Sequence, residues 1–490
     1  MARRPVMGDI LDRSELLSVL QGYNPWWGRR PLAVPDFRRI AFQVCRGYLA
    51  EPSLRRAIHL SGPRRVGKTT ILYQIADALL KDGADPKSIC YLSLDHPLLK
   101  VFTLPKILKL YHESTYPEGK PAVLLFDEVQ YSDDWELHIK QLVDHHPEYR
   151  ILATGSASVA HHRKLTESGV GRWVTVQIPT LSFYEFLQIR GEETGRIPDD
   201  LRPTDLFSMK QGDLSLLARH FGPLMPLFQR YLLVGGFPET AQQDNAVLCQ
   251  RLLREDVVER VLKRDMAALF GIRSVNELEK LFIYICLTSG GIFVARKCAD
   301  ALETTRPTIA NYLQFLEKAN LIYLLPPYAL RGKRTLKAQP KVYLVDAALR
   351  NAVLLRGEEI LNNPEEMGVI AETTVLRHLF AYYYRDVPEI AYWRDSATQK
   401  EVDIIVKSPA YVIPVEVKYR DKALLSEQDG IVAFCRQEKV KSAYWVTQRE
   451  DDFGVQHFRG VATRFLRVPA HIFVYLLGQA ERLLWKQPAS

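Results

Sequence analysis

The sequence predicts an α/β protein of several domains, with a parallel sheet and crossover helices in its N-terminal part. Its 490 residues are too many for one hydrophobic core, and its 47% hydrophobic and 25% charged residues are typical of folded, soluble proteins. From about residue 36 to 195, short apolar runs alternate with stretches of helical periodicity, as in a sheet of parallel strands. The runs expected to form these strands are 58–60, 91–94, 123–126, 151–153 and 174–176.

Changes in periodicity and charge divide the rest of the chain. Beyond the parallel sheet we expect a helical stretch, then helices followed by a basic hairpin, and finally a second α/β domain after a charged linker. The expected boundaries are 1–35 for an N-terminal extension, 36–195 for the parallel-sheet core, 196–268 for a helical lid, 269–355 for a winged helix and 361–490 for the C-terminal α/β domain.

The charge balance and the cysteines narrow the class of protein. The chain has 65 Lys+Arg against 57 Asp+Glu, a net charge of +8, which favours a polyanionic partner without identifying one. Its six cysteines form no CxxC pair, so we expect reduced thiols and neither disulfides nor a zinc site. We find no signal peptide, and no apolar run approaches the roughly 18–20 residues that span a bilayer. These features predict a cytoplasmic protein without membrane contact.

A phosphate-binding loop is predicted directly after the first strand. Residues 62–69, GPRRVGKT, match the pattern GxxxxGK[ST] between an apolar strand and a helix, which is the context that the motif requires. The glycines allow backbone amides to face phosphates, and the helix N-terminus adds its dipole. Lys68 is expected to reach the β- and γ-phosphates of ATP, and Thr69 to hold Mg²⁺. The nucleotide-binding residues are Gly62, Pro63, Arg64, Arg65, Val66, Gly67, Lys68, Thr69 and Thr70.

Two carboxylates at the end of a later strand are expected to complete this site. Asp127 would support the magnesium ion and Glu128 would polarise the attacking water, unless Glu128 is only a solvated charge at a strand end. Ser156, after the next strand, is either a sensor of the γ-phosphate or a turn serine. Arg172 either projects into the site of a neighbouring subunit in a ring-forming ATPase or forms a structural ion pair.

Taken together, these motifs resemble a known family. In order, GPRRVGKTT, LLFDEVQ, ATGSAS, the pair Gly171-Arg172, PTLSFYEF (179–186) and YLLVGGFPE (231–239) resemble bacterial and archaeal AAA+ ATPases with an AAA_14-type P-loop domain and a C-terminal DUF4143 domain. The resemblance covers nearly the whole chain. It implies binding of ATP and Mg²⁺ and a homo-oligomeric ring such as a hexamer. It also implies that Pro238, in a GxP-like element, lies beside the nucleotide base, although a GGFP turn also serves as a helix stop.

A DNA-binding winged helix is expected in the middle of the chain. The helix from 305 to 316 has an apolar face and a polar face, and the hairpin after it carries basic residues without an intervening acid. The alternative is a winged helix used for protein contact, with solvated lysines. The candidate DNA contacts are Arg306, Asn311 and Gln314 on the helix, and Arg331, Lys333, Arg334, Lys337 and Lys341 on the hairpin.

Two carboxylates and a lysine converge on a predicted hairpin in the C-terminal domain. Strand periodicity places Asp403 opposite the apolar face and puts Glu416 and Lys418 together. Asp403 and Glu416 would bind Mg²⁺ or Mn²⁺, Lys418 would orient the attacking water, and Glu372 would complete the set. The pattern resembles the PD-(D/E)xK restriction-endonuclease-like fold. The alternatives are a solvated hairpin face and a fold that survives without cleavage.

These observations predict an ATP-dependent DNA-processing protein. ATP hydrolysis would be coupled to DNA binding and to metal-dependent cleavage, with branched DNA such as a Holliday junction as an attractive substrate. Two rival hypotheses stay open. One is a STAND-like nucleotide switch with a non-cleaving C-terminal interaction module, and the other is a DNA-binding regulator with residual ATPase activity.

Overall fold

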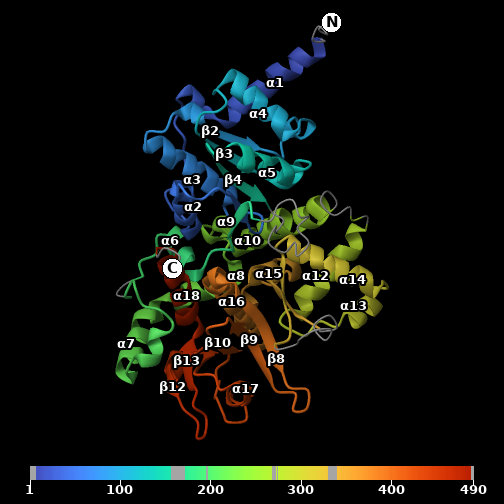
Figure 1. Ribbon diagram of the computed structural model, residues 1–490. Coiled ribbons are helices and arrows are strands. Elements are labelled where there is room, and N and C mark those ends of the chain that lie inside the picture. Colours follow the sequence, from blue (N-terminus) through green and yellow to red (C-terminus); the bar gives the residue numbers. More distant parts are fainter. Residues whose placement is uncertain are drawn as a thin grey trace. The chain divides into compact units, whose positions relative to one another are not determined.

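The computed structural model describes residues 7–155, 171–194, 197–266, 272, 274–328 and 339–486 (Figure 1). The chain forms two compact units that meet at Ile178 and Pro179. The sequence suggested that the first core extends to about 195, but α6 (Phe183–Ile189) belongs to the second unit. There the backbone N–H of Phe183 donates to Nε2 of His378 at 2.9 Å, and the Phe183 ring packs against Tyr475. Tertiary contacts far along the chain therefore fix this boundary.

The first unit contains the predicted parallel sheet. Within the described residues its strand order is β2-β3-β4-β1-β5, and every neighbouring pair is parallel. The strands are β1 (Ala57–Ser61), β2 (Ile89–Ser93), β3 (Ala122–Asp127), β4 (Tyr149–Gly155) and β5 (Trp173–Gln177). Because β4 lies between β1 and β3, its carboxyl end is placed between the loop after β1 and the carboxylates after β3.

Helices cover both faces of this sheet, which explains the near-continuous apolar character of the strands. In Figure 1, α2 (Ile40–Ala50) and α3 (Lys68–Lys81) lie together on one side of the strands. On the other face, apolar residues of α1 (Met7–Tyr23), α4 (Leu104–Ser114) and α5 (Trp135–His145) form one core with the strands. This packing holds the carboxyl ends of the strands rigidly in place.

The N-terminal segment docks on β2, an edge strand of the sheet. The side chain of Asn24 accepts from the backbone N–H of Tyr91 at 2.7 Å and donates to its carbonyl at 2.9 Å, as a neighbouring strand would. The indole N–H groups of Trp26 and Trp27 both donate to the carbonyl of Ile89, at 3.0 and 2.8 Å. Side chains therefore satisfy the outward-facing backbone groups of this strand.

The second unit begins with helices that correspond to the predicted lid. They are α6, α7 (Gln211–Phe221), α8 (Met225–Val234), α9 (Pro238–Ala241) and α10 (Ala246–Leu252), followed by π-helical turns at Leu253–Glu259 and Val261–Asp265. Gly235 and Gly236 lie between α8 and α9. Both positions require glycine, because their backbone lies too close to Asp346 and Leu181 to leave room for a side chain. A Cβ on Gly235, whose φ is 74°, would lie 2.4 Å from Oδ1 of Asp346, and one on Gly236 would lie 2.4 Å from the carbonyl of Leu181.

Three helices and a hairpin follow, in the order that the sequence predicts for the winged helix. The helices are α12 (Val275–Thr288), α13 (Ala295–Ala301) and α14 (Arg306–Lys318). The antiparallel strands are β6 (Ile322–Leu325) and β7 (Lys341–Leu344), and α15 (Ala347–Leu354) comes next. Thr305 caps α14 by accepting from the N–H of Thr308, and Pro307 lies in its first turn, where proline is tolerated.

The C-terminal part is a mixed sheet flanked by helices. Its order, for the residues that the structure describes, is β12-β13-β11-β10-β9-β8. The strands are β8 (Glu389–Arg394), β9 (Glu401–Lys407), β10 (Val412–Lys418), β11 (Ser442–Thr447), β12 (Gly454–Gln456) and β13 (Arg464–Pro469). The helices are α16 (Pro364–Tyr383), α17 (Gly430–Glu438) and α18 (Ala470–Lys486). Since α16 and α17 both contact β9 and β10, the predicted hairpin is buried on both faces instead of having a solvated one.

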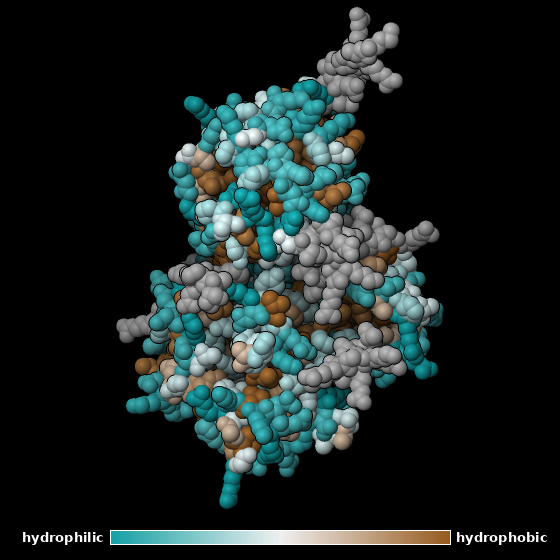
Figure 2. Space-filling view, viewed as in Figure 1, coloured by the Kyte–Doolittle hydropathy of each residue, from teal (hydrophilic) through white to brown (hydrophobic). Residues whose placement is uncertain are grey.

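Short 3-10 turns join several of these elements. They lie at Pro25–Gly28, Pro86–Ser88, Leu99–Val101, Val129–Tyr131, Asp205–Ser208, Gly222–Leu224, Glu358–Asn362, Tyr384–Asp386 and Glu450–Asp452. Both units expose a mainly hydrophilic surface with scattered apolar residues (Figure 2). None of the helices in the described ranges combines the length and the apolar character that a bilayer crossing requires.

Candidate nucleotide site and carboxylate cluster

The predicted phosphate-binding loop joins β1 to α3. Its backbone adopts left-handed conformations at Arg65 and Gly67, with φ of 64° and 93°. Gly62 allows the loop to turn close to the sheet, because a Cβ at this position would lie 2.1 Å from the carbonyl oxygen of Ile178. These conformations leave little room for substitution, as the motif requires.

Lys68 is held inside the loop. Its ammonium donates to the carbonyls of Gly62 and Pro63 at 2.8 and 2.7 Å, and the side chain is buried. The carbonyl of Val66 accepts from the guanidinium of Arg39 at 3.0 Å, so the residue before α2 supports the loop from outside the motif. The ammonium is therefore placed within the curve of the loop, where phosphates would lie.

Asp127 is the centre of a buried hydrogen-bond network at the carboxyl ends of the strands. Its Oδ2 accepts from the hydroxyl of Thr69 at 2.7 Å and from the hydroxyl of Tyr91 at 2.9 Å. Its Oδ1 accepts from the hydroxyl of Thr154 in a short hydrogen bond. The first turn of α3, β2 and β4 thus each contribute a hydroxyl donor to one carboxylate.

Glu128 lies beside this network in a strained conformation. Its φ is 55°, a left-handed value that is uncommon outside glycine and that marks functional sites when the surroundings enforce it. Its N–H donates to the hydroxyl of Thr154 at 3.0 Å, and its carboxylate accepts from the amide of Gln130. Burial raises the pKa of Glu128, although the nearby ammonium of Lys68 opposes the shift. A carboxylate with a raised pKa is a stronger base.

These residues fit a magnesium–nucleotide complex. Thr69 and Asp127 present oxygen atoms of the kind that Mg²⁺ prefers, beside a loop whose close backbone approach depends on Gly62. Lys68 would hold the phosphates. Glu128 follows Asp127 in the chain, and the hydroxyl of Thr154 contacts both residues.

Two further predicted residues of this unit have different outcomes. Ser156 lies outside the described residues. Arg172 directly precedes β5, which is parallel to β1, so Arg172 lies at the amino ends of the strands. The loop that follows β1 lies at their carboxyl ends. Arg172 also forms a partly exposed ion pair with Asp144. It is therefore distant from the loop of its own subunit, which agrees with either predicted role.

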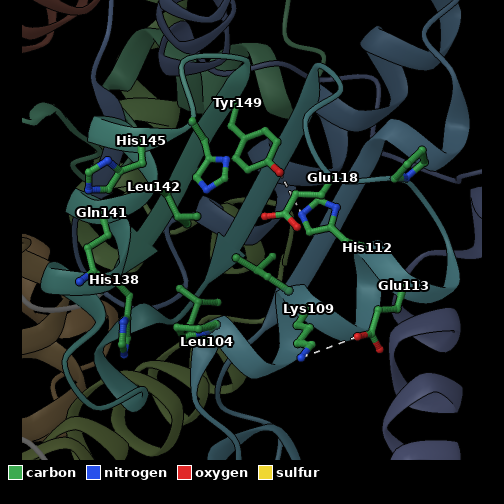
Figure 3. A pocket seen from close by; sticks show the side chains of 14 residues that line it. Leu104, Lys109, His112, Glu113, Glu118, His138, Gln141, Leu142, His145 and Tyr149 are labelled. Carbon is green, nitrogen blue, oxygen red and sulfur yellow. Dashed lines mark hydrogen bonds and ion pairs between the residues drawn. The ribbon is translucent and has the colours of Figure 1, made fainter.

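A cavity of about 630 Å³ lies between α4 and α5 (Figure 3). The ring of Tyr149 stacks between His112 and His146, with centroids 5.7 and 4.8 Å away, and the Tyr149 hydroxyl lies 3.1 Å from Nε2 of His112. Burial raises the pKa of Tyr149 to about 12. Because Tyr149 begins β4, this cavity lies at the amino ends of the strands. It is therefore distinct from the nucleotide site.

The structure describes part of the predicted DNA-binding surface. On α14, Ile309, Leu313 and Leu316 are buried as expected. The opposite face exposes Arg306, Asn311 and Gln314. The hairpin residues Arg331, Lys333, Arg334 and Lys337 lie outside the described residues.

The prediction for Lys341 as a DNA contact needs correcting. Its side chain is only 3% exposed, and its ammonium lies 2.5 Å from Oε1 of Glu401, 3.4 Å from Oδ1 of Asp403 and 3.7 Å from Oε1 of Glu372. A basic residue enclosed by three carboxylates is not available to a phosphate backbone. The segment 331–337 that precedes it is basic, but β7 places Lys341 against the acids of the C-terminal domain instead of in solvent.

The predicted C-terminal residues do come together in space. The ammonium of Lys418 contacts the carboxylate of Glu416 and lies 4.0 Å from Oδ2 of Asp403. The N–H of Val417 donates to Oδ2 of Asp403 at 3.0 Å, and the N–H of Asp403 donates to Oε2 of Glu416 at 3.3 Å. Lys341 links this pair to Glu372. We call Lys341, Glu372, Glu401, Asp403, Glu416 and Lys418 the carboxylate cluster.

The charges within the carboxylate cluster are unevenly distributed. Burial and the neighbouring charge of Asp403 raise the pKa of Glu372 to about 7 and that of Glu416 to about 8. Burial would also raise the pKa of Asp403, but the ammonium groups of Lys341 and Lys418 outweigh it and lower that pKa. Asp403 is thus the carboxylate that both lysines stabilise in its charged form.

Pro238 is the first residue of α9 in the second unit, and α8 ends at Val234, directly before Gly235. Its predicted contact with the nucleotide base stays a prediction. The sequence did not point to Tyr91, Thr154, Gln130 or Arg39. The signals in the sequence were that Tyr91 lies in a predicted strand, that Thr154 directly follows one and that Gln130 belongs to the LLFDEVQ motif. The contacts of Tyr91 and Thr154 depend on the strand order, which these signals do not give.

Three family models match successive parts of the chain, and the first extends past the boundary between the two units to residue 187. Residues 54–187 match the family model described as "AAA domain" (AAA_14). Residues 225–360 match "Domain of unknown function (DUF8612)", and residues 367–466 match "Domain of unknown function (DUF4143)".

Relatives and solved structures resemble this chain at low sequence identity. An uncharacterized protein of Haemophilus influenzae is 25% identical over 76% of this chain and 85% of its own length. The uncharacterized protein MJ1637 of Methanocaldococcus jannaschii is 26% identical, over 68% of each chain. Among solved structures, AMPPCP-bound DnaA from Aquifex aeolicus is 18% identical, covers 58% of this chain and 89% of its own, and has a TM-score of 0.25.

The parallel sheet, the loop around Lys68 and the carboxylates after β3 define a P-loop nucleoside-triphosphatase domain. More specifically, the chain carries an AAA domain of the AAA_14 type at 54–187 and a DUF4143 domain at 367–466.

Proposed function

We propose that this chain hydrolyses ATP at the loop around Lys68 and uses the ATP cycle to control its contact with DNA. One observation carries the first part. The hydroxyl of Thr69, the residue after Lys68, meets the buried carboxylate of Asp127 at 2.7 Å, and Glu128 follows directly. This juxtaposition unites the two halves of a P-loop site.

Each side chain has a distinct task in this proposal. Bound magnesium–ATP supplies the phosphoryl group that is transferred to water. Lys68 neutralises phosphate charge, and Thr69 and Asp127 hold the metal. Glu128 orients the attacking water and accepts its proton, for which its raised pKa suits it. Tyr91 and Thr154 keep the Asp127 carboxylate in one orientation.

The exposed face of α14 supports the DNA part of the proposal. Arg306, Asn311 and Gln314 carry the donors and acceptors that read base edges or bind phosphates. Branched DNA, such as a four-way junction, is the substrate class that we propose. We also propose a homo-oligomer in which Arg172 contacts the nucleotide bound by the neighbouring subunit. Arg172 lies at the amino ends of the strands, whereas the phosphate-binding loop of the same chain lies at their carboxyl ends.

The experiment measures phosphate release by the purified full chain with Mg²⁺, alone and with linear, forked and four-way DNA of equal length. We expect release to depend on Mg²⁺ and to increase most with the four-way DNA. Absence of release under all conditions from folded protein would contradict the ATPase. Release that no DNA changes, together with no DNA binding at low salt, would contradict the coupling to DNA.

A specific observation favours a second candidate, the nucleotide switch with a non-cleaving C-terminal module. The residues of the candidate nuclease site are mostly buried and paired with lysines, and Asp403 and Glu416 are only 8% and 6% exposed. A phosphodiester needs access to such groups before they cleave it. Under this candidate, Glu416→Ala and Lys418→Ala leave DNA intact exactly as the wild type does. Metal-dependent nicking that either substitution abolishes would refute it.

A further inference from the structure

Lys341 places its ammonium among three acids of the carboxylate cluster. It comes from β7 in the DUF8612 region, whereas the carboxylates come from the DUF4143 region. Its ammonium contacts Glu401, Asp403 and Glu372 at 2.5, 3.4 and 3.7 Å. A positive charge that belongs to the chain thus contacts Asp403, one of the two acids predicted to bind Mg²⁺, and Glu372, which was predicted to complete the site.

The cluster does not fit a magnesium ion. Mg²⁺ requires near-octahedral oxygen ligands at roughly 2.0–2.1 Å, and it usually retains several waters. The space between Glu372 and Asp403 is filled by the ammonium of Lys341, while Lys418 engages Asp403 and Glu416 on the other side. Within the described part of the chain, no three His, Cys, Asp or Glu side chains are arranged to hold a metal ion.

Other contacts fix β7 and the preceding segment against the same domain. The hydroxyl of Tyr343 donates to Glu372 at 2.5 Å. The hydroxyl of Tyr392, on β8, donates to the carbonyl of Gln339 at 2.7 Å. On β6, the ring of Tyr323 stacks on Phe380 of α16 with centroids 4.2 Å apart. Lys341 is therefore one of several groups by which the hairpin is anchored to the C-terminal domain.

We propose that Lys341 is the built-in cation of the carboxylate cluster, so that the cluster is a metal-free junction between the DUF8612 and DUF4143 regions and does not cleave DNA. Removing one partner from a buried ionic group is strongly destabilising, because it leaves uncompensated charge. Moving Lys341 away would leave Asp403 and Glu372 near the single ammonium of Lys418, and Glu401 with the more exposed Arg394 at 3.8 Å. The ion pairs thus favour a fixed position of the hairpin. This inference is independent of ATP hydrolysis by the first unit.

The test is a titration of the full chain with Mn²⁺ in the absence of nucleotide. The electron paramagnetic resonance signal of free Mn²⁺ measures how much of the metal is bound. Only binding that Asp403→Asn removes is assigned to the cluster, which separates it from metal at Asp127. We expect no such binding by the wild type or by the control Lys407→Met, which removes a more exposed lysine of β9. Lys341→Met should gain one Mn²⁺ per chain, with affinity at least tenfold above the wild type.

Thermal unfolding provides a second measurement. Lys341→Met should unfold roughly 5 °C or more below the wild type, and Lys407→Met should stay within about 1 °C of it. If Lys341→Met does not fold, the double substitution Lys341→Met with Glu401→Gln, which removes one charge of each sign, replaces it in the Mn²⁺ titration. Mn²⁺ bound by the wild type and lost in Asp403→Asn would overturn the proposal. So would a folded Lys341 variant that gains no Mn²⁺, or equal stability of the two lysine variants.

Discussion

Replacing Tyr91 by phenylalanine tests whether the side chains around Asp127 serve the metal. The substitution removes a single hydroxyl and leaves a ring of nearly the same shape in the buried core of the first unit. That hydroxyl donates to Oδ2 of Asp127 at 2.9 Å. Burial and the carboxylate of Asp127 raise the pKa of Tyr91, so the phenol stays a protonated donor throughout the accessible pH range.

The magnitude follows from the number of donors around this carboxylate. Thr69, Tyr91 and Thr154 donate to Asp127, and Thr69 must turn toward the metal when magnesium binds. Only Tyr91 and Thr154 would then hold the carboxylate, so Tyr91→Phe removes half of its support. Loss of a hydrogen bond to a metal-binding carboxylate typically weakens metal binding about 10-fold, or roughly 1.4 kcal/mol.

The assay is ATP turnover at saturating ATP over a range of Mg²⁺ concentrations. We expect the Mg²⁺ concentration at half-maximal rate to rise about tenfold in Tyr91→Phe. Tyr111→Phe is the matched control, because its buried phenol donates at 2.6 Å to the carbonyl of Lys87, a backbone group outside the site. An unchanged Mg²⁺ requirement in Tyr91→Phe, or an equal shift in both variants, would refute the positioning role of Tyr91.

Five other substitutions have expected outcomes. Lys68→Ala should abolish ATP turnover. Glu128→Gln should bind ATP normally and hydrolyse it at least about 100-fold more slowly than the wild type. Equal rates for Glu128→Gln and the wild type would exclude Glu128 as the base. Arg172→Ala should lose turnover, and mixing it with Lys68→Ala protein should restore part of it if the arginine acts between subunits; a mixture as inactive as its components would contradict this. Arg306→Ala should weaken DNA binding and lower the slope of log affinity against log salt by about 0.9 if it contacts one phosphate, as salt titration of DNA binding would show. Burial and the charge of Lys68 lower the pKa of His59 to about 3. The folded state therefore binds fewer protons than the unfolded state below pH 6.5, and the free energy of unfolding falls as the pH decreases. Between pH 6.5 and 5.5, urea titrations should show a loss of about 1 kcal/mol in this free energy for the wild type and not for His59→Gln.

Local patterns in the sequence were sufficient to predict the parallel strands of the first unit and its phosphate-binding loop, but not where the unit ends. Each strand is a short apolar run, and the loop motif lies between β1 and α3 as predicted. The positions of Tyr91 and Thr154 could not be predicted, because they depend on β2 and β4 both pairing with β3. Nothing in the local sequence gives that order.

The C-terminal site shows the opposite limit. Strand periodicity correctly placed Glu416 beside Lys418, and Asp403 lies close to both. The role of Lys341 was missed because a basic segment at 331–337 precedes it, which favoured a solvated wing. Only the packing of β7 against the C-terminal sheet shows that its charge is matched by acids more than thirty residues away in the chain.

The pairing of Asn24 and the two indoles with β2 has a consequence for how the ATPase domain is isolated. A fragment that begins at the family match, residue 54, would lack these groups and expose the backbone of Ile89 and Tyr91 as an open strand edge. Such edges recruit strands from other molecules. The minimal fragment that stays monodisperse should therefore begin before residue 24, and shorter ones should aggregate even though they retain every residue of the nucleotide site.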